Sequence, residues 1–194
     1  MEENKLKSNK RCGWCGDDAL YQHYHDYVWG RPRHDSQDLF AKLCLDGQQA
    51  GLSWITILRK EKSYYAAYDD FDPEKIIHYD QAKIDSLLQD AGVVRNKLKV
   101  NSIIKNAKGY LAIEAEMGSF SDYIWSFVGG KVIQNNWETM AEIPVLTAES
   151  EAMSKALKKR GFTFVGPTIC YAYMQAVGMV NDHLRTCPQF EQCR

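Results

Sequence analysis

Candidate metal ligands lie in pairs near the two ends of this 194-residue chain. Cys12 and His25 lie near the start, and His183 and Cys187 lie near the finish. His183 and Cys187 are four residues apart, so on a helix both would point off one face and could bind one ion. Two cysteines and two histidines complete a tetrahedral zinc set, which leaves no position for water or substrate. We therefore expect one structural Zn²⁺ per chain that joins the two termini.

Other interpretations of the same residues stay open. Ordinary buried cysteines and histidines would give the same pattern, because Cys12 and His25 do not have the tight spacing of a zinc finger. Cys15 and His23 are alternative ligands at the N-terminal end. Cys12 and Cys15 also form a C-x-x-C pair, which indicates a thiol redox protein when it opens a helix after a strand. No strand is predicted before this pair, which argues against the redox interpretation.

The length and composition are typical of one globular domain, with 45% hydrophobic and 25% charged residues. We expect residues 1–10 to form a flexible polar tail and residues 11–194 to form a single helical domain. That domain is expected to combine a central helical part, about 36–128, with a part built from both termini. Because no apolar run reaches membrane-spanning length and no signal peptide is present, we expect a cytoplasmic protein without membrane contacts.

The net charge of −1 gives no sign of a polyanionic partner, but the distribution of charge is uneven. Residues 91–113 contain five basic and no acidic residues, and residues 152–181 contain Lys155, Lys158, Lys159 and Arg160 and again no acidic residue. Two such segments can form a local phosphate-binding face. Two solvated helix faces would show the same pattern.

Helical periodicity runs through nearly the whole chain, and the predicted fold class is all-α. Asp35 or Ser36 can cap one helix, and Asp72 followed by Pro73 is typical of the start of another. Leu98 is predicted to lie on the buried stripe of a long helix. Residues 131–147 show no regular pattern. The helices are expected over residues 17–28, 36 to about 47–51, 53–65, from 73, 84–89, 95–116, 119–128, 149–160 and 167–180.

Residues 154–178 predict a helix, a short hairpin containing Gly166, and a second helix opened by Pro167 and Thr168. A glycine beside a helix N-terminus lets backbone amides approach an anion closely, and the helix dipole favours negative charge there. The basic residues just before the turn add positive charge at the same point. This pattern is typical of a motif that holds a DNA phosphate without reading bases, although an ordinary helical hairpin would look similar.

The segment from Cys44 to Trp54 contains the residue types that accept a base extruded from DNA. Trp54 offers an aromatic face, Asp46 a carboxylate for the base edge, and Leu52 an apolar wedge to fill the gap in the duplex. Tyrosines beside a lone carboxylate also suit a cationic ring, through cation–π attraction and charge-assisted hydrogen bonds. A dense aromatic set is also typical of a protein core.

These motifs occur together in a known enzyme family. Over residues 11–187 the chain resembles the 3-methyladenine DNA glycosylase I family, the zinc-containing branch of the helix-hairpin-helix glycosylases. Several long motifs in the right order are more specific than any one of them. The matching segments are RCGW (11–14), LYQHYHDYVWG (20–30), GQQAGLSWITIL (47–58), AGVVRNKLK (91–99), SKALKKRGFTFVGPTICY (154–171) and VNDH (180–183) with Cys187.

The resemblance implies roles for individual residues. Asp46 would orient the base, but it stands where the family usually has glutamate, so it is one methylene shorter. The implied zinc ligands are Cys12, His25, His183 and Cys187; the base pocket is Tyr21, Tyr24, Trp29 and Trp54; and the residues that contact DNA are Gly51, Leu52, Lys159, Arg160, Gly166 and Thr168.

The resemblance also implies base-excision repair, in which 3-methyladenine is hydrolysed from alkylated double-stranded DNA, releasing the free base and leaving an abasic site. The methylated base is cationic, so it leaves as a neutral molecule and needs no proton. Asn181 falls where related enzymes have a catalytic aspartate and cannot act as a base. Asp182 is not expected to be catalytic, because its neighbour His183 is assigned to zinc. No lysine is placed to form a Schiff base, so lyase activity is not expected. The alternative is a zinc-stabilised module that binds the lesion without cutting.

Overall fold

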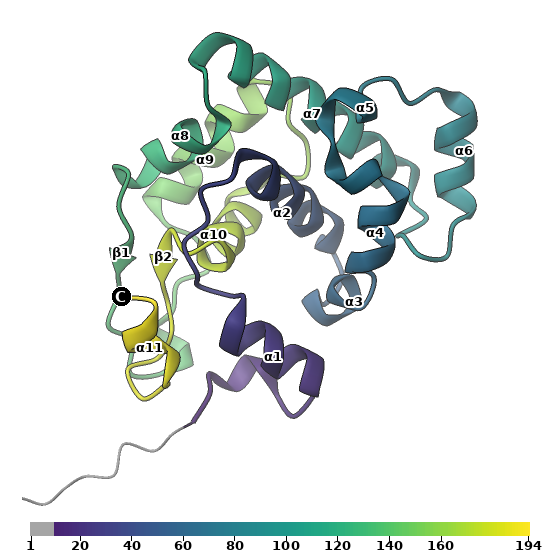
Figure 1. The fold of residues 1–194 in the computed structure, drawn as a ribbon. Coiled ribbons are helices and arrows are strands. Elements are labelled where there is room, and N and C mark those ends of the chain that lie inside the picture. Colours follow the sequence, from purple (N-terminus) through teal and green to yellow (C-terminus); the bar gives the residue numbers. More distant parts are fainter. Residues whose placement is uncertain (1–9) are drawn as a thin grey trace, which may run out of the picture.

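The computed structural model describes residues 10–194, so all of the predicted tail except Lys10 lies outside the described residues. Within them the fold is mostly helical, in agreement with the predicted class, with one short parallel strand pair. No helix in this part of the chain is both long and apolar enough to cross a membrane. In chain order (Figure 1) the elements are η1 (Gly13–Cys15), α1 (Ala19–Tyr27), α2 (Ser36–Gln49), α3 (Trp54–Leu58), α4 (Glu61–Ala67), η2 (Asp69–Phe71), α5 (Pro73–Ile76), α6 (Gln81–Gln89), α7 (Lys97–Met117), α8 (Phe120–Trp125), η3 (Ser126–Val128), β1 (Ile133–Gln134), η4 (Met140–Glu142), α9 (Ala148–Lys159), α10 (Pro167–Ala176), β2 (Val180–Asn181) and α11 (Gln189–Gln192).

Capping side chains determine where most of the helices begin. Asp18 accepts a hydrogen bond from the Tyr21 amide at the start of α1, and Asp35 accepts one from the Asp38 amide at the start of α2. Of the two predicted caps for α2, Asp35 is therefore the one used. Each such bond satisfies a backbone donor that the helix leaves unpaired. Further caps of this kind are Asp72, Asp80, Asn96, Ser119 and Thr147.

The single helix predicted over 53–65 is two helices, α3 and α4. Between them the Lys60 amide bonds the carbonyl three residues back, so the backbone tightens and turns. Arg59 forms an ion pair with Asp18 at 2.7 Å, and the Lys60 ammonium donates to the carbonyl of Ala91. These partners are distant in sequence, so the local pattern could not reveal the break.

The predicted burial of Leu98 is wrong, because this side chain is 73% exposed. The buried stripe of α7 begins at Val100 and continues through Ile103 and Ala107. Leu98 precedes Val100 by two residues, which is about 200° around a helix of 3.6 residues per turn, so it points away from the core.

Helix α2 lies at the centre of the molecule. Its residues are buried continuously from Leu39 to Gln48, and α7 and α10 both pack against it. Helix α9 packs against α10, and Phe162 in the turn between them closes on α7 at Gly109. A Cβ atom at Gly109 would lie 2.4 Å from the Phe162 ring, so only glycine fits there. This arrangement fixes α2 and the α9–α10 pair relative to each other.

The two ends of the described chain meet on one side of the fold, where the purple α1 region lies beside the yellow α11 (Figure 1). Strand β2 leads into this region and pairs with β1, with Ile133 opposite Val180. Residues 182–188 form an irregular turn. The expectation that His183 and Cys187 share a helix face is therefore wrong. The turn still brings the two side chains to the same point, because the backbone reverses direction between them. The Cys187 amide donates to the Leu184 carbonyl at 2.8 Å.

Candidate active site and metal cluster

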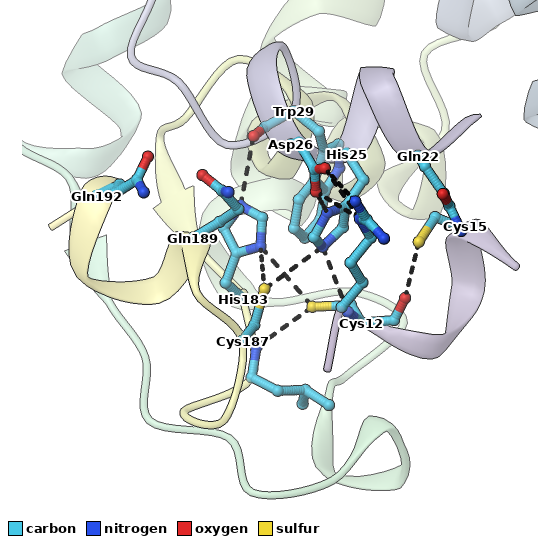
Figure 2. Close-up of polar contacts among 12 residues, drawn as sticks. Cys12, Cys15, Gln22, His25, Asp26, Trp29, His183, Cys187, Gln189 and Gln192 are labelled. Carbon is cyan, nitrogen blue, oxygen red and sulfur yellow. Dashed lines mark hydrogen bonds and ion pairs between the residues drawn. The ribbon is translucent and has the colours of Figure 1, made fainter. Parts of the chain in front are cut away.

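The four predicted metal ligands converge where the chain ends meet. Their donor atoms all lie within 4.8 Å of one another, and all four side chains are buried. The Cys187 Sγ atom lies 3.6 Å from His25 Nε2 and 3.6 Å from His183 Nδ1, and Cys12 Sγ lies 3.7 Å from His183 Nδ1 (Figure 2). Zinc–sulfur and zinc–nitrogen bonds of about 2.3 and 2.0 Å require ligand separations of roughly 3.5 Å in a tetrahedron. The cluster can therefore hold a tetrahedral metal ion.

Hydrogen bonds behind the cluster orient its histidines. His25 turns Nε2 toward the sulfurs and places Nδ1 2.8 Å from the Asp26 carboxylate, which in turn pairs with Arg11. His183 points its Nδ1 atom toward the sulfurs, and its Nε2 atom lies 3.4 Å from the Trp29 carbonyl oxygen (Figure 2). Such partners fix ring orientation and tautomer in metal sites.

The two thiols of the cluster differ in ionisation, because their mutual hydrogen bond and burial both raise the pKa of Cys12. Hydrogen bonding from the Cys12 thiol holds the pKa of Cys187 well below its ordinary value, with smaller contributions from the two histidines, although burial opposes them. A thiolate is the form of cysteine that binds metal. The alternative ligands lie elsewhere: the Cys15 thiol donates to the Cys12 carbonyl, and His23 is exposed and packs on Tyr27.

A cavity of about 180 Å³ lies beside the cluster. For comparison, a cavity of roughly 150 Å³ binds benzene, so a planar ring can enter a space of this size. Trp29 belongs to both sites: its ring lies 4.6 Å from the His183 ring, and it also lines the cavity. All of the predicted pocket residues lie here, among a lining of Trp14, Tyr21, Tyr24, Trp29, Lys42, Asp46, Gln49, Trp54, Met140, Ile143, Ala172, Gln175 and Ala176.

Lys42 is the charged residue of the pocket lining that the sequence analysis missed. It lies one helical turn before Asp46 on α2, and the two form a buried ion pair in which Asp46 Oδ1 accepts from the Lys42 ammonium. The ammonium also lies 3.8 Å from the centre of the Trp54 ring. Lysine and aspartate four residues apart are an ordinary helix-surface pattern, so the sequence signal was present but unspecific.

Burial changes the chemistry of this pair. It raises the pKa of the Asp46 carboxyl and lowers the pKa of the Lys42 ammonium, while the attraction between them partly offsets both shifts. Within the described protein, the Oδ2 atom of Asp46 and the Nε1 atom of Trp54 are buried without a hydrogen-bond partner. Buried polar atoms are nearly always paired, so this acceptor and donor are available to a ligand.

The predicted DNA-contacting residues are only partly brought together. Gly51, Leu52 and Thr168 line a second depression that shares Asp46 with the base cavity. Leu52 is 42% exposed, as a wedge residue would need to be. Arg160, by contrast, pairs with Glu116 through two contacts of 2.7 and 3.1 Å. Lys159 is exposed at the end of α9, and Gly166 precedes α10.

Lys99, from the first basic segment, is buried instead of facing a phosphate. Its ammonium donates to the carbonyls of Gln48 and Ala50, each at 2.7 Å. It thereby caps the end of α2 and holds the backbone that leads to Gly51.

Neither candidate for an additional catalytic group lies in the pocket lining. Asn181 is fully buried and donates to the Phe190 carbonyl at 2.9 Å. Asp182 is buried and accepts from four donors. Both oxygens of this carboxylate are therefore occupied by hydrogen bonds within the fold. Those donors are Asn135, Trp137, Tyr171 and Gln175, at 2.6 to 2.8 Å.

Comparison with known proteins identifies the family of a chain that combines this aromatic cavity with the four-donor cluster. The family model described as methyladenine glycosylase matches residues 14–191. The chain belongs to this family. It is 52% identical over 178 residues to the DNA-3-methyladenine glycosylase of Haemophilus influenzae, covering 92% of this chain and 96% of that one.

Solved structures of methyladenine glycosylases have the same fold. A crystal structure of 3-methyladenine DNA glycosylase I matches with a TM-score of 0.91 and 48% identity, over 92% of this chain and 98% of that one. The Staphylococcus aureus enzyme, in a structure that concerns its recognition of 3-methyladenine, matches with a TM-score of 0.90 and 39% identity, over 93% and 96%. The resemblance inferred from the motifs is therefore confirmed.

Proposed function

We propose that this protein is a DNA-3-methyladenine glycosylase of base-excision repair. It hydrolyses the N-glycosidic bond of 3-methyladenine in alkylated double-stranded DNA, releases the free base and leaves an abasic site. Family membership over residues 14–191 supports the reaction class. The observation that carries the proposal for the site is the aromatic cavity with one buried carboxylate, Asp46, whose Oδ2 has no partner within the described protein.

The pocket residues divide the work of recognition. The lesion leaves the DNA stack and lies against Trp54 and Tyr24, whose rings are 5.4 Å apart. A cationic purine gains from these aromatic faces and from the carboxylate more than an undamaged, neutral base does. Asp46 orients the base edge, and because it is shorter than the glutamate usual in the family, the base must lie closer to α2.

The reaction needs little further chemistry from the protein. The methylated base departs as a neutral molecule, water attacks the sugar carbon as the bond breaks, and that water loses one proton to solvent. Asp46 stabilises the positive charge of the bound base and, as the bond breaks, the same charge as it passes to the sugar. Lys42, the lysine in the pocket lining, is paired with Asp46 and packs on the Trp54 ring. We therefore assign it to the base and not to a Schiff base with the sugar, and we expect a monofunctional enzyme that leaves the DNA strand intact.

Two further elements place the DNA. Leu52 fills the space that the lesion vacates, and Gly51 lets the backbone turn with a φ of 75°. Gly166 needs no positive φ, and a Cβ atom there would meet nothing within 4 Å. A glycine at position 166 is therefore explained by the close approach of a DNA phosphate to the start of α10, as in a helix-hairpin-helix motif. Lys159, Arg160 and Thr168 would flank the DNA at this point.

The four-donor cluster would hold one zinc ion through Cys12, His25, His183 and Cys187. Bound zinc would supply no reactive water, because four protein ligands complete its tetrahedron. These residues instead join the ends of the chain and hold Trp29 against the cavity. We expect the protein to act on DNA in the cytoplasm and to need no obligate protein partner.

Base release from methylated DNA tests the function directly. Wild-type protein should liberate free 3-methyladenine, and Asp46→Asn should slow release by about 100-fold, the size expected when a preorganised charge contact is lost. Asp46→Glu is the matched control and should retain or improve release. Binding of methylated DNA without release by the wild type would favour the lesion-binding module instead. Equal rates for wild type and Asp46→Asn would remove Asp46 from the site.

A further inference from the structure

Lys42 already occupies the place in the pocket that suits a cation. Its ammonium lies 3.8 Å from the centre of the Trp54 ring and donates to Asp46 Oδ1. These are the two contacts that a positively charged purine would make, an aromatic face and a carboxylate. Lys42 is only 4% exposed, so it is a built part of the cavity wall.

We propose that Lys42 is a specificity-determining residue that couples the binding of a cationic base to the loss of its own charge. For each cationic base bound, the N–H⁺ bond at Lys42 Nζ breaks and one proton passes to solvent. The neutral amine remains, and Asp46 stays ionised for the base. This inference rests on the proposed function, because it takes a methylated purine as the ligand.

The charges around Lys42 explain the coupling. Two positive charges in one small buried cavity repel strongly, so a cationic base and a charged Lys42 oppose each other. Asp46 on α2 and Glu61 on α4 favour the charged amine, whereas Arg33, in the segment before α2, disfavours it. The Tyr24 phenol, facing the cavity from α1, is neutral because burial raises its pKa. Burial also lowers the pKa of Lys42, which eases release of its proton.

Purines that differ in charge provide the test. The permanently cationic 3,9-dimethyladenine is compared with neutral 9-methyladenine, and each dissociation constant is measured by tryptophan fluorescence. In Lys42→Met, binding of the cationic purine should tighten by at least about tenfold relative to the neutral one, because a like charge in the same buried cavity is removed. Lys62→Met, which changes an exposed lysine on α4, is the control and should match the wild type.

The dependence on pH gives a second, independent readout. If one proton is released, wild-type affinity for the cationic purine rises by up to about tenfold per pH unit while Lys42 is still charged. The neutral purine should show no such slope, and Lys42→Met should lose it. Calorimetry of the wild type in two buffers of different ionisation enthalpy counts the released protons, and this measurement needs no variant to fold.

Several outcomes would overturn the role of Lys42. Unchanged selectivity in folded Lys42→Met, weaker binding of both purines, or no proton release by the wild type would each do so. Lys42→Gln serves as a second variant, with folding checked by circular dichroism. Base release from methylated DNA is measured in parallel. Release by the wild type with no effect of Lys42 overturns this inference alone, whereas no release overturns the proposed function as well.

Discussion

The four-donor cluster and the aromatic pocket are both buried polar sites, and they share Trp29, yet they are built in opposite ways. In the cluster, both histidines have oriented partners, Asp26 and the Trp29 carbonyl, and the donor atoms face one another. In the pocket, Asp46 Oδ2 and Trp54 Nε1 face a cavity without a partner in the described protein. The comparison separates a site that stabilises the fold from a site prepared for a ligand.

The largest effect is expected when the cluster is broken. Cys187→Ala should lower the free energy of unfolding by about 5 kcal/mol or more, because metal-binding energy at a structural site is folding energy. Metal content and thermal unfolding measure this loss. Cys15→Ser is the control, since Cys15 lies outside the donor set, and it should keep about one metal ion per chain. Loss of metal from Cys15→Ser would mean that the ligand set is wrong.

Trp54→Ala should lower the affinity for methylated DNA strongly and the stability of the fold much less than Cys187→Ala does. The change removes the ring on which the base stacks, which corresponds to about 2 kcal/mol, or roughly 30-fold in KM for methylated DNA. Steady-state base release measures KM, and Trp54→Phe should bring KM most of the way back to the wild-type value. Metal content should stay at the wild-type value. Metal loss in Trp54→Ala would show that the two sites are not separable.

A smaller effect should come from the residue behind His25. Asp26→Asn removes the carboxylate that orients the ring, and metal affinity should fall by about tenfold, at the lower end of such outer-shell effects. Competition with a chelator measures the affinity. At saturating zinc, base release should equal that of the wild type. A slower reaction under those conditions would mean that Asp26 affects the pocket as well as the metal.

The smallest effect is a shift on a pH profile. Because burial raises the pKa of Asp46, its carboxylate is lost as pH falls through a value above the ordinary one of about 3.9. Single-turnover release should therefore decline on the acid side with an apparent pKa higher than this, and the decline should be absent from the residual activity of Asp46→Asn. A wild-type profile that stays flat down to the ordinary value would contradict the assignment of Asp46.

The sequence predicted the cluster better than the pocket. Several cysteines and histidines near the chain ends were candidates, and residue type left Cys15 and His23 open as alternatives. The family resemblance implied the set Cys12, His25, His183 and Cys187, and the structure brings the donor atoms of these four together. The starts of several helices could be predicted from local residues, because a capping side chain bonds a backbone amide within three residues of it. Features that depend on neighbouring residues, such as the helix starts, can therefore be predicted from the sequence.

Features that depend on distant contacts were missed. Lys42 and Asp46 resemble a solvated helix pair, and only the packing of other elements around α2 turns them into a pocket. The β1–β2 pair joins Ile133 to Val180, a contact that no local pattern shows. His183 and Cys187 were predicted to meet on a helix, whereas residues 182–188 form an irregular turn that brings them together.

The packing of His183 on Trp29 has a consequence for how the protein is made. The two residues are 154 positions apart, so the ribosome releases the pocket tryptophan long before the imidazole that supports it. Domains generally fold as units. This wall of the cavity is therefore complete only after one of the last segments of the chain has emerged.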